Sequence, residues 1–119
     1  DEEGTISTIT NYVDGVKNGE EVKLNKRGHL EGRTFYLNNQ YHGLVGTYKN
    51  GRRVQEINYQ NGQLDGPTYK YFANGKIQQE INYKEGKQHG AFKYYDEDGK
   101  VTLEYEYKNG EKVSGGIVE

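Results

Sequence analysis

Apolar and polar residues alternate in short runs along most of this chain, and no stretch has the spacing of an amphipathic helix. In residues 77–83, for example, Ile77, Ile81 and Tyr83 are apolar while the residues among them are polar. A two-residue period of this kind is typical of strands. Because turn residues separate the runs, the sequence predicts an all-β fold, a single elongated antiparallel meander sheet of about ten short strands.

The turn residues between these runs form two sets. The first set is Asp14-Gly15, Asn38-Asn39, Asn61-Gly62, Glu85-Gly86 and Asn109-Gly110, and the second is Arg27-Gly28, Asn50-Gly51, Asn74-Gly75 and Asp98-Gly99. Asn-Gly and Asp-Gly pairs supply the positive φ of tight hairpin turns, so both sets are predicted to be tight turns. Asn18-Gly19 resembles another turn, but its register matches His42-Gly43, which places it early in a strand.

The turns belong to an internal repeat. Tyrosine recurs in steps of 24, 23, 24 and 24 residues, at Tyr12, Tyr36, Tyr59, Tyr83 and Tyr107. The residue missing from the short step lies between Gly43 and Gly51. Two turns per period mean two strands per repeat. We therefore expect one domain over residues 1–119, with repeats at about 12–35, 36–58, 59–82 and 83–106 and a partial unit at 107–119.

The repeated side chains predict how the sheet is stabilised. Equivalent residues lie two strands apart, so the tyrosine column should line one face at intervals of about 9.5 Å. A second column is expected to fill the gaps and a third to add a row: Leu24, Tyr48, Tyr71 and Tyr95, then Thr10, Thr34, Ile57, Ile81 and Tyr105. No predicted helix covers either face, so much of both should be open to water.

Residues 83–100 carry the pattern Tyr-x-x-Gly-x-x-x-Gly, then an aromatic strand, then Asp-Gly-Lys. This unit resembles a MORN-type repeat and is most similar to the variant in bacterial proteins of the YwqK antitoxin family. Residues 59–76 fit equally well, whereas Asn39 replaces a glycine in the second repeat. The resemblance implies an elongated single sheet that binds proteins, or lipid in some relatives, and for the bacterial variant the neutralisation of a partner toxin.

The composition of the chain argues against several classes of function. The net charge is -2, the pI is about 6.0 and there is no cysteine, which argues against nucleic-acid partners and excludes disulfides and thiolate chemistry. No apolar run reaches the ~20 residues that a membrane span needs. An acidic start, Asp1-Glu2-Glu3, fits a mature terminus after cleavage of a leader. The compartment therefore stays open between the cytoplasm and the periplasm or cell envelope.

Catalytic, metal and cofactor sites are not expected. His42 and His89 share a column, but four strands separate them by about 19 Å, too far for a common ion. The acidic residues 96–98 match a turn in the other repeats, and the glycines precede strands, whereas a phosphate cradle opens a helix. A solvent-exposed single-layer sheet also offers few pockets in which the pKa of a carboxylate would be shifted. The protein is therefore expected not to be an enzyme.

Candidate partner-binding residues come from comparing the repeats with one another. Phe35 takes a place held elsewhere by asparagine, and Arg53 takes one that is elsewhere apolar. Since aromatic residues and arginine are enriched at interface anchors, the predicted partner-binding residues are Phe35, Tyr41, His42, Arg52, Arg53, Tyr69 and Phe92. The alternative is drift between repeats, with the stem of Arg53 lying over a tyrosine.

The leading functional hypothesis is a non-enzymatic antitoxin or immunity protein that binds a toxin or effector protein. The alternative is a structural or envelope-associated scaffold. Such a scaffold would self-associate through edge strands expected at residues 5–12 and 111–118, because unpaired strand edges can pair with another chain.

Overall fold

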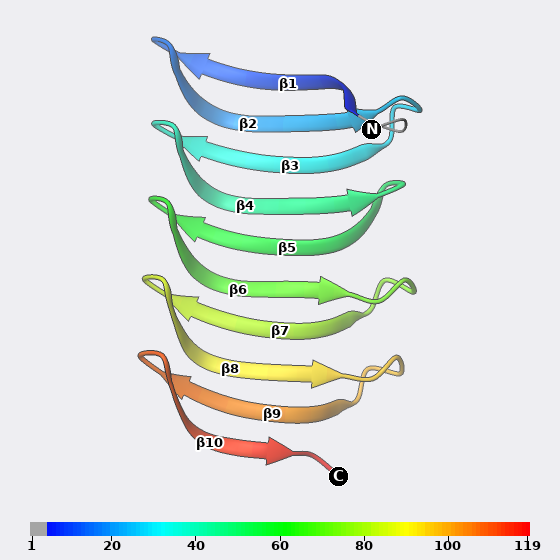
Figure 1. Cartoon of the computed structure of the whole chain (residues 1–119), viewed down its shortest axis with the longest axis vertical. Coiled ribbons are helices and arrows are strands. Elements are labelled where there is room, and N and C mark those ends of the chain that lie inside the picture. Colours follow the sequence, from blue (N-terminus) through cyan, green and yellow to red (C-terminus); the bar gives the residue numbers. More distant parts are fainter. Residues whose placement is uncertain (1–4) are drawn as a thin grey trace.

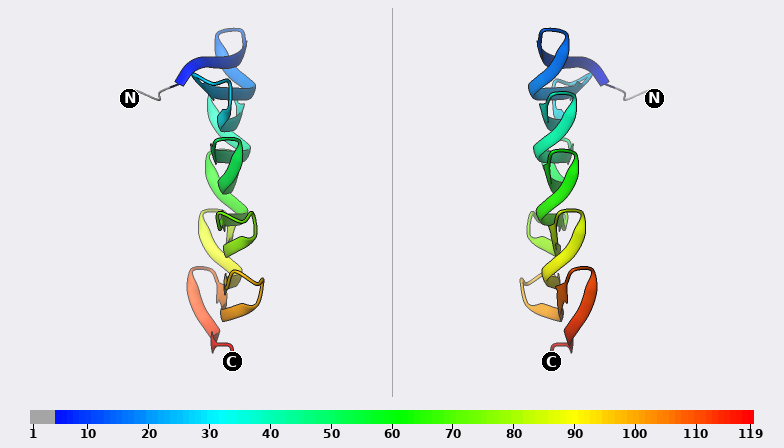
Figure 2. Two further views of the ribbon diagram at one scale, coloured as in Figure 1. Left: turned by 90° about the vertical axis from the view of Figure 1, so that its right-hand side faces the viewer. Right: turned by 90° about the vertical axis from the view of Figure 1, so that its left-hand side faces the viewer.

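The structure, a computed structural model, describes residues 5–119 as one antiparallel sheet in which every strand pairs with its neighbours in sequence (Figure 1). The strands are β1 (Thr5–Val13), β2 (Val16–Asn25), β3 (Leu30–Leu37), β4 (Gln40–Lys49), β5 (Arg52–Gln60), β6 (Gln63–Tyr71), β7 (Ile77–Lys84), β8 (Lys87–Tyr95), β9 (Val101–Lys108) and β10 (Glu111–Ile117). The described residues form a single narrow layer, 48 × 31 × 19 Å (Figure 2). The predicted all-β meander is confirmed.

The first set of turns consists of tight two-residue hairpins. Both central residues have positive φ, as at Asn61 (50°) and Gly62 (83°), which is the type I′ geometry whose twist matches the flanking strands. The Asn50-Gly51 turn between β4 and β5 has the same geometry, with φ of 52° and 80°. The positive φ values confirm the prediction of tight turns at these positions. Asparagine and glycine suit them because both tolerate the left-handed region.

The other three turns of the second set are longer, and the prediction of tight turns is wrong for them. After β2, β6 and β8 only the glycines, Gly28, Gly75 and Gly99, have positive φ. A side chain closes each turn instead. Asn25 Oδ1 accepts the N–H groups of Arg27 and His29, both at 2.9 Å. The β6–β7 turn spans residues 72–76 whereas β4–β5 uses only residues 50–51, so the residue missing from the short step is lost from a turn.

Glycines near the start of β2, β4, β6 and β8 lie within bulges. Tyr59 pairs with Leu64 but Ile57 pairs with Thr68, so β6 carries extra residues at this point. Gly66, within the bulge, has a φ of 97°. Asn58 Nδ2 donates to Pro67 O at 2.7 Å. Equivalent bonds join Asn11 to Glu20 O and Asn82 to Ala91 O, so the asparagine column secures the bulges. Asn18-Gly19 lies within β2, as predicted.

Register and side-chain alternation assign each strand residue to one of two faces. A row of successive register partners crosses what we call the aromatic face: Thr10, Glu21, Thr34, Val45, Ile57, Thr68, Ile81, Phe92 and Tyr105. A second row crosses the charged face: Val22, Arg33, Gly46, Glu56, Tyr69, Glu80, Lys93 and Glu104. The first row contains the predicted third column, which is thereby confirmed.

The tyrosine column lies on the aromatic face, but the predicted second column does not fill its gaps. Tyr41 does so between β3 and β5, with ring centroids 5.5 Å from Tyr36 and 5.0 Å from Tyr59. Tyr48 instead pairs with Arg53 at the opposite ends of the strands. The prediction for the second column was wrong because the sequence pattern does not reveal the register of the bulged strands. The observed register places Tyr48, Tyr71 and Tyr95 beside the second set of turns.

Within residues 7–119 no apolar side chain is fully buried, so the sheet has no conventional core. Cross-strand pairs, worth about 0.2–1 kcal/mol each, therefore carry much of its stability. One buried polar group belongs to this network, since Glu21 is only 7% exposed. Its Oε2 accepts a 2.7 Å hydrogen bond from Thr10 and lies 3.5 Å from Lys17 Nζ.

Candidate functional site

Arginine and tyrosine side chains of β3 to β6 form a continuous cluster on the charged face. We call this cluster the arginine–tyrosine patch and define it as Arg33, Phe35, Tyr48, Arg53, Tyr69 and Tyr71. The Arg33 guanidinium lies 5.8 Å from the centroid of the Phe35 ring. Tyr48 contributes to raising the pKa of Arg33, for which the hydrogen bond to Glu20 is the main cause. The patch therefore extends from β3 into β4.

The patch continues from Tyr48 to the next strands. Arg53 is the register partner of Tyr48, and its guanidinium lies 4.4 Å from the centroid of the Tyr71 ring. Tyr71 and Tyr69 are 6.2 Å apart, centroid to centroid. Cations over aromatic faces at these distances are mutually stabilising. The result is a surface of alternating cations and rings.

Carboxylates hold both arginines in place. Arg33 Nε donates to Glu20 Oε2 at 2.6 Å. Arg53 Nη1 lies 3.7 Å from Glu56 Oε1, which also accepts a 2.5 Å hydrogen bond from the Tyr71 hydroxyl. Burial, and then the bond to Glu56, raises the pKa of Tyr71. The arginine side chains nevertheless remain 40% and 52% exposed, so each keeps donors for a partner.

Gly46 provides the space that the patch needs in β4. A Cβ added at Gly46 would lie 2.8 Å from the ring of Tyr48. The absence of a side chain therefore lets the Tyr48 ring lie flat across the strand. Because Gly46 pairs with Arg33 on one side and Glu56 on the other, this ring bridges the two halves of the patch.

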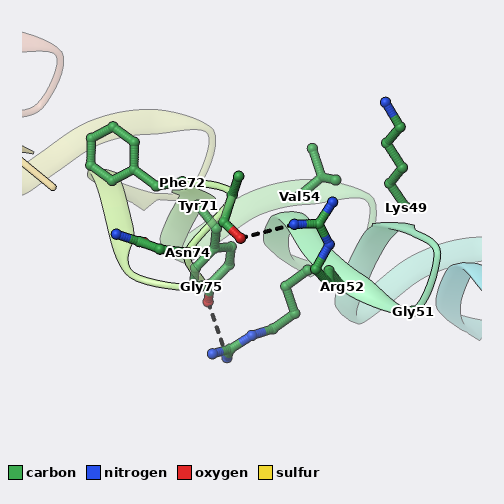
Figure 3. A pocket seen from close by; sticks show the side chains of 10 residues that line it. Lys49, Gly51, Arg52, Val54, Tyr71, Phe72, Asn74 and Gly75 are labelled. Carbon is green, nitrogen blue, oxygen red and sulfur yellow. Dashed lines mark hydrogen bonds between the residues drawn. The ribbon is translucent and has the colours of Figure 1, made fainter.

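A hollow of about 590 Å³ lies beside the patch, between the short β4–β5 turn and the longer β6–β7 turn (Figure 3). Its lining includes Lys49, Arg52, Val54, Phe72 and Asn74. Arg52 Nη1 donates across the hollow to Ala73 O at 2.9 Å. Phe72 and Lys49 stand on opposite sides of it in Figure 3.

The structure brings only part of the predicted set together. Phe35, Arg53 and Tyr69 share the patch, and Arg52 lies at the adjoining hollow. Two residues are on the aromatic face. Tyr41 packs between tyrosines there, and Phe92 packs 5.7 Å from Tyr105. Phe92 therefore lies on the opposite face from Tyr69, because Phe92 pairs with Ile81 while Tyr69 pairs with its neighbour Glu80.

His42 has a structural contact. Its Nδ1 accepts the N–H of Asn61 at 3.2 Å, and His89 Nδ1 accepts that of Asn109 at 3.3 Å. These two bonds tie β4 and β8 to the tight turns that begin at Asn61 and Asn109. No cluster of three His, Asp or Glu side chains suited to a metal occurs in the described part of the chain. The expectations of no metal, no cofactor and no catalysis remain predictions.

Sequence reasoning missed Arg33, Tyr48, Glu56 and Tyr71 as parts of the site. A signal for Arg33 was present, because the equivalent positions in later repeats are Glu56, Glu80 and Glu104. Tyr71 gave no signal by itself, since its column contains tyrosine in three repeats, at Tyr48, Tyr71 and Tyr95. Tyr71 belongs to the patch because Arg53 lies over its ring, and the positions equivalent to Arg53 in other repeats are apolar.

Comparison with known structures supports the fold. A mutant of S. aureus TarM, crystallised in complex with Fondaparinux, alpha-GlcNAc-glycerol and UDP, aligns over 93% of this chain with a TM-score of 0.53 and 10% identity. A second crystal structure of TarM aligns over 93% with a TM-score of 0.52 and 12% identity. This chain spans only 22% of the length of either TarM chain, and the likeness concerns the fold alone. The comparison with curated proteins gives no match.

Family comparison identifies the repeat. Residues 64–85 and 88–109 each match the MORN repeat variant, and repeats of this kind generally bind proteins or membranes. Over residues 5–119 there is no helix with the length and apolar character of a membrane span. The matched segments lie on the hairpins β6–β7 and β8–β9, so these four of the ten strands match the MORN repeat variant.

Proposed function

We propose that this protein is a non-enzymatic binding module that acts as an antitoxin or immunity protein, neutralising a cognate bacterial toxin by direct contact. The MORN-variant repeats support the general class. The proposal of a toxin as partner rests on the resemblance of the repeat unit to bacterial antitoxin proteins. The arginine–tyrosine patch is the proposed contact surface.

The observation that carries the proposal is where the repeats differ. Three residues depart from the repeat pattern: Arg33, Phe35 and Arg53 stand where later repeats have glutamate, asparagine and apolar residues. All three contribute to one continuous exposed patch. Random sequence drift between repeats would not be expected to place its changes on one surface. Arginine and tyrosine are also residue types enriched at the anchors of protein interfaces.

The geometry suits a preformed interface. The guanidinium groups are already oriented by Glu20 and Glu56, so little side-chain freedom is lost when a partner binds. Their exposed N–H groups would bind carboxylates of a toxin, and the tyrosine rings would pack against its surface. Binding of a rigid sheet would cover the toxin's active surface by steric exclusion.

The test uses substitutions that restore the pattern of the other repeats. Phe35→Asn introduces the residue that bonds the bulge in other repeats, and Arg53→Ile introduces the residue found at Ile77. Both should leave the unfolding midpoint close to wild type. Lys108→Gln, at an exposed position away from the patch, is the matched control.

A partner captured from the source organism would be purified and tested for toxicity with and without the protein. We expect one stoichiometric partner whose toxic activity is lost on mixing, and at least tenfold weaker binding by each patch variant. A partner without toxic activity would contradict the antitoxin role. Recovery of only the protein itself or of envelope components would instead favour the scaffold. Unchanged binding by both variants would remove the patch from the interface.

A further inference from the structure

The hollow between the β4–β5 and β6–β7 turns differs from the equivalent region of every other repeat. The turn beside it is shorter, with residues 50–51 in place of the residues 96–100 that follow β8. Lys49 also stands where Asn25 and Asp96 close their own turns with side-chain hydrogen bonds. The shorter turn and the added cation thus meet at one place.

The charges at the hollow are of one sign. Lys49, Arg52 and Arg53 are the cations in its lining, and no acidic residue is among the described residues that line it. Glu56 neutralises Arg53. Lys49 has no ion pair and Arg52 donates only to a carbonyl, as far as residues 5–119 are concerned. This part of a chain with a net charge of -2 is therefore locally positive.

Apolar groups stand next to these two cations. Val54 is 40% exposed, and Phe72 belongs to the lining on the side of the opposite turn (Figure 3). A volume of about 590 Å³ is within the ~300–1,000 Å³ range of ligand pockets and holds a few side chains. Cations beside an apolar wall match an acidic side chain next to an aromatic or aliphatic one.

We propose that this hollow binds an acidic segment of a partner protein, with carboxylates on Lys49 and Arg52 and an adjacent apolar side chain against Phe72 and Val54. The inference rests on the proposed protein-binding function and specifies the chemistry of the partner. Arg52 is held by Ala73 O, so its remaining N–H groups are presented for a bidentate contact with a carboxylate.

The experiment is a two-dimensional amide NMR titration of the full chain. The probe is a synthetic peptide of alternating glutamate and phenylalanine, acetylated and amidated. A peptide with glutamine in place of glutamate and inorganic phosphate are the comparison ligands. We expect shift changes at residues 49–54 and 71–75 with the glutamate peptide, and at least tenfold weaker binding of the glutamine peptide.

Variants assign the contact. Lys49→Gln and Arg52→Gln should each weaken binding of the glutamate peptide about tenfold, since a charge-assisted hydrogen bond is lost. Lys100→Gln is the matched control, because Lys100 follows Gly99 as Arg52 follows Gly51. Thermal unfolding of each variant shows whether the fold is retained.

Four outcomes would overturn the proposal: shifts confined to other regions, equal binding of both peptides, full affinity in both variants, or phosphate binding at the hollow without peptide binding. Failure of the proposed function is separable from these. Absence of any toxin partner would refute the antitoxin role while peptide binding at the hollow persisted. A toxin complex unaffected by Lys49→Gln and Arg52→Gln would refute only the inference.

Discussion

The hydroxyl of Tyr71 donates a 2.5 Å hydrogen bond to Oε1 of Glu56, linking a tyrosine in β6 to a carboxylate in the preceding strand. Tyr95 and Glu80 occupy the equivalent positions one repeat later, with a longer contact of 3.4 Å. In a sheet without buried apolar side chains in its described part, such ties across strands carry stability that a core would otherwise supply. The Tyr71 contact also orients the carboxylate that holds Arg53.

Replacing Tyr71 by phenylalanine should therefore destabilise the protein. The variant keeps the ring under Arg53 but loses the bond to a charged acceptor, worth about 1.5 kcal/mol or more. Urea unfolding followed by circular dichroism measures the change. Tyr95→Phe is the control and should cost less, because its hydrogen bond is longer. Equal losses of stability in the two variants would show that the hydrogen bond from Tyr71 to Glu56 contributes no more than the longer one from Tyr95 to Glu80.

Alkaline pH should weaken the fold. Burial raises the pKa of Tyr36, Tyr69, Tyr71 and Tyr95 above the ordinary value of 10.0. A group whose pKa is higher when folded contributes stability that is complete below its unfolded pKa and is lost as pH rises above that value. The midpoint of thermal unfolding should therefore fall between pH 10 and pH 11.5. The unfolding midpoint of Tyr71→Phe should fall less steeply with pH than that of wild type. Parallel curves for the two proteins would contradict a contribution of Tyr71 to the loss of stability.

Gly66 should be intolerant of a side chain. Its φ of 97° lies in a region that L-residues rarely adopt, and an added Cβ would meet the Cβ of Asn58 at 3.5 Å. We expect Gly66→Ala to cost about 1–2 kcal/mol. Gly116→Ala is the matched control, because Gly116 lacks a positive φ and has no atom within 4 Å of the added Cβ. Similar stability of the two variants would mean that the bulge is dispensable.

The repeat explains how much of this fold could be predicted. The period and the Asn-Gly pairs suffice for the strands and tight turns, because both are local properties. The wider turns at Gly75 and Gly99 were missed since their closure by Asn74 and Asp96 side chains depends on loop length. The bulge at Gly66 was missed as well, and it shifts the register from which all cross-strand neighbours follow.

The candidate site was less predictable for the same reason. Phe35 and Arg53 are visible as departures from the repeat, but their partners are set by register. Tyr48 faces Arg53 because β4 and β5 shift by one residue near the short turn. Assigning Phe92 to the opposite face likewise required knowing which residues of β7 and β8 pair.

Thr68 offers a stabilising substitution on the aromatic face. Its Oγ1 is buried between Ile57 and Ile81 and has no hydrogen-bond partner among the described residues. Thr68→Val keeps the shape and removes the unpaired hydroxyl, so we expect stability to rise by about 0.5–1 kcal/mol. Thr47→Val, at an exposed position of the same face, is the control. A loss of stability in Thr68→Val would show that the hydroxyl is satisfied in solution.

Glu21 should make the first repeat sensitive to acid. The hydrogen bond from Thr10 is the main cause of its lowered pKa, and Lys17 lowers it further against the opposing effect of burial. A carboxyl whose pKa is lower when folded contributes stability above its unfolded pKa, near 4.5, and this contribution is lost as pH falls through the folded value. Wild type should therefore exceed Glu21→Gln by about 1 kcal/mol at pH 7, and the difference should vanish toward pH 3.

The measurement is urea unfolding of both proteins at pH 7, 5, 4 and 3. Thr10→Val tests the cause: it removes the largest contribution to the lowered pKa, so it should reproduce most of the loss and make Glu21→Gln nearly silent in the double variant. Glu111→Gln, at an exposed position of β10, is the control for loss of a negative charge. A wild-type advantage that persists unchanged at pH 3 would mean that packing of the Glu21 side chain, rather than its charge, stabilises the row from Thr10 to Thr34.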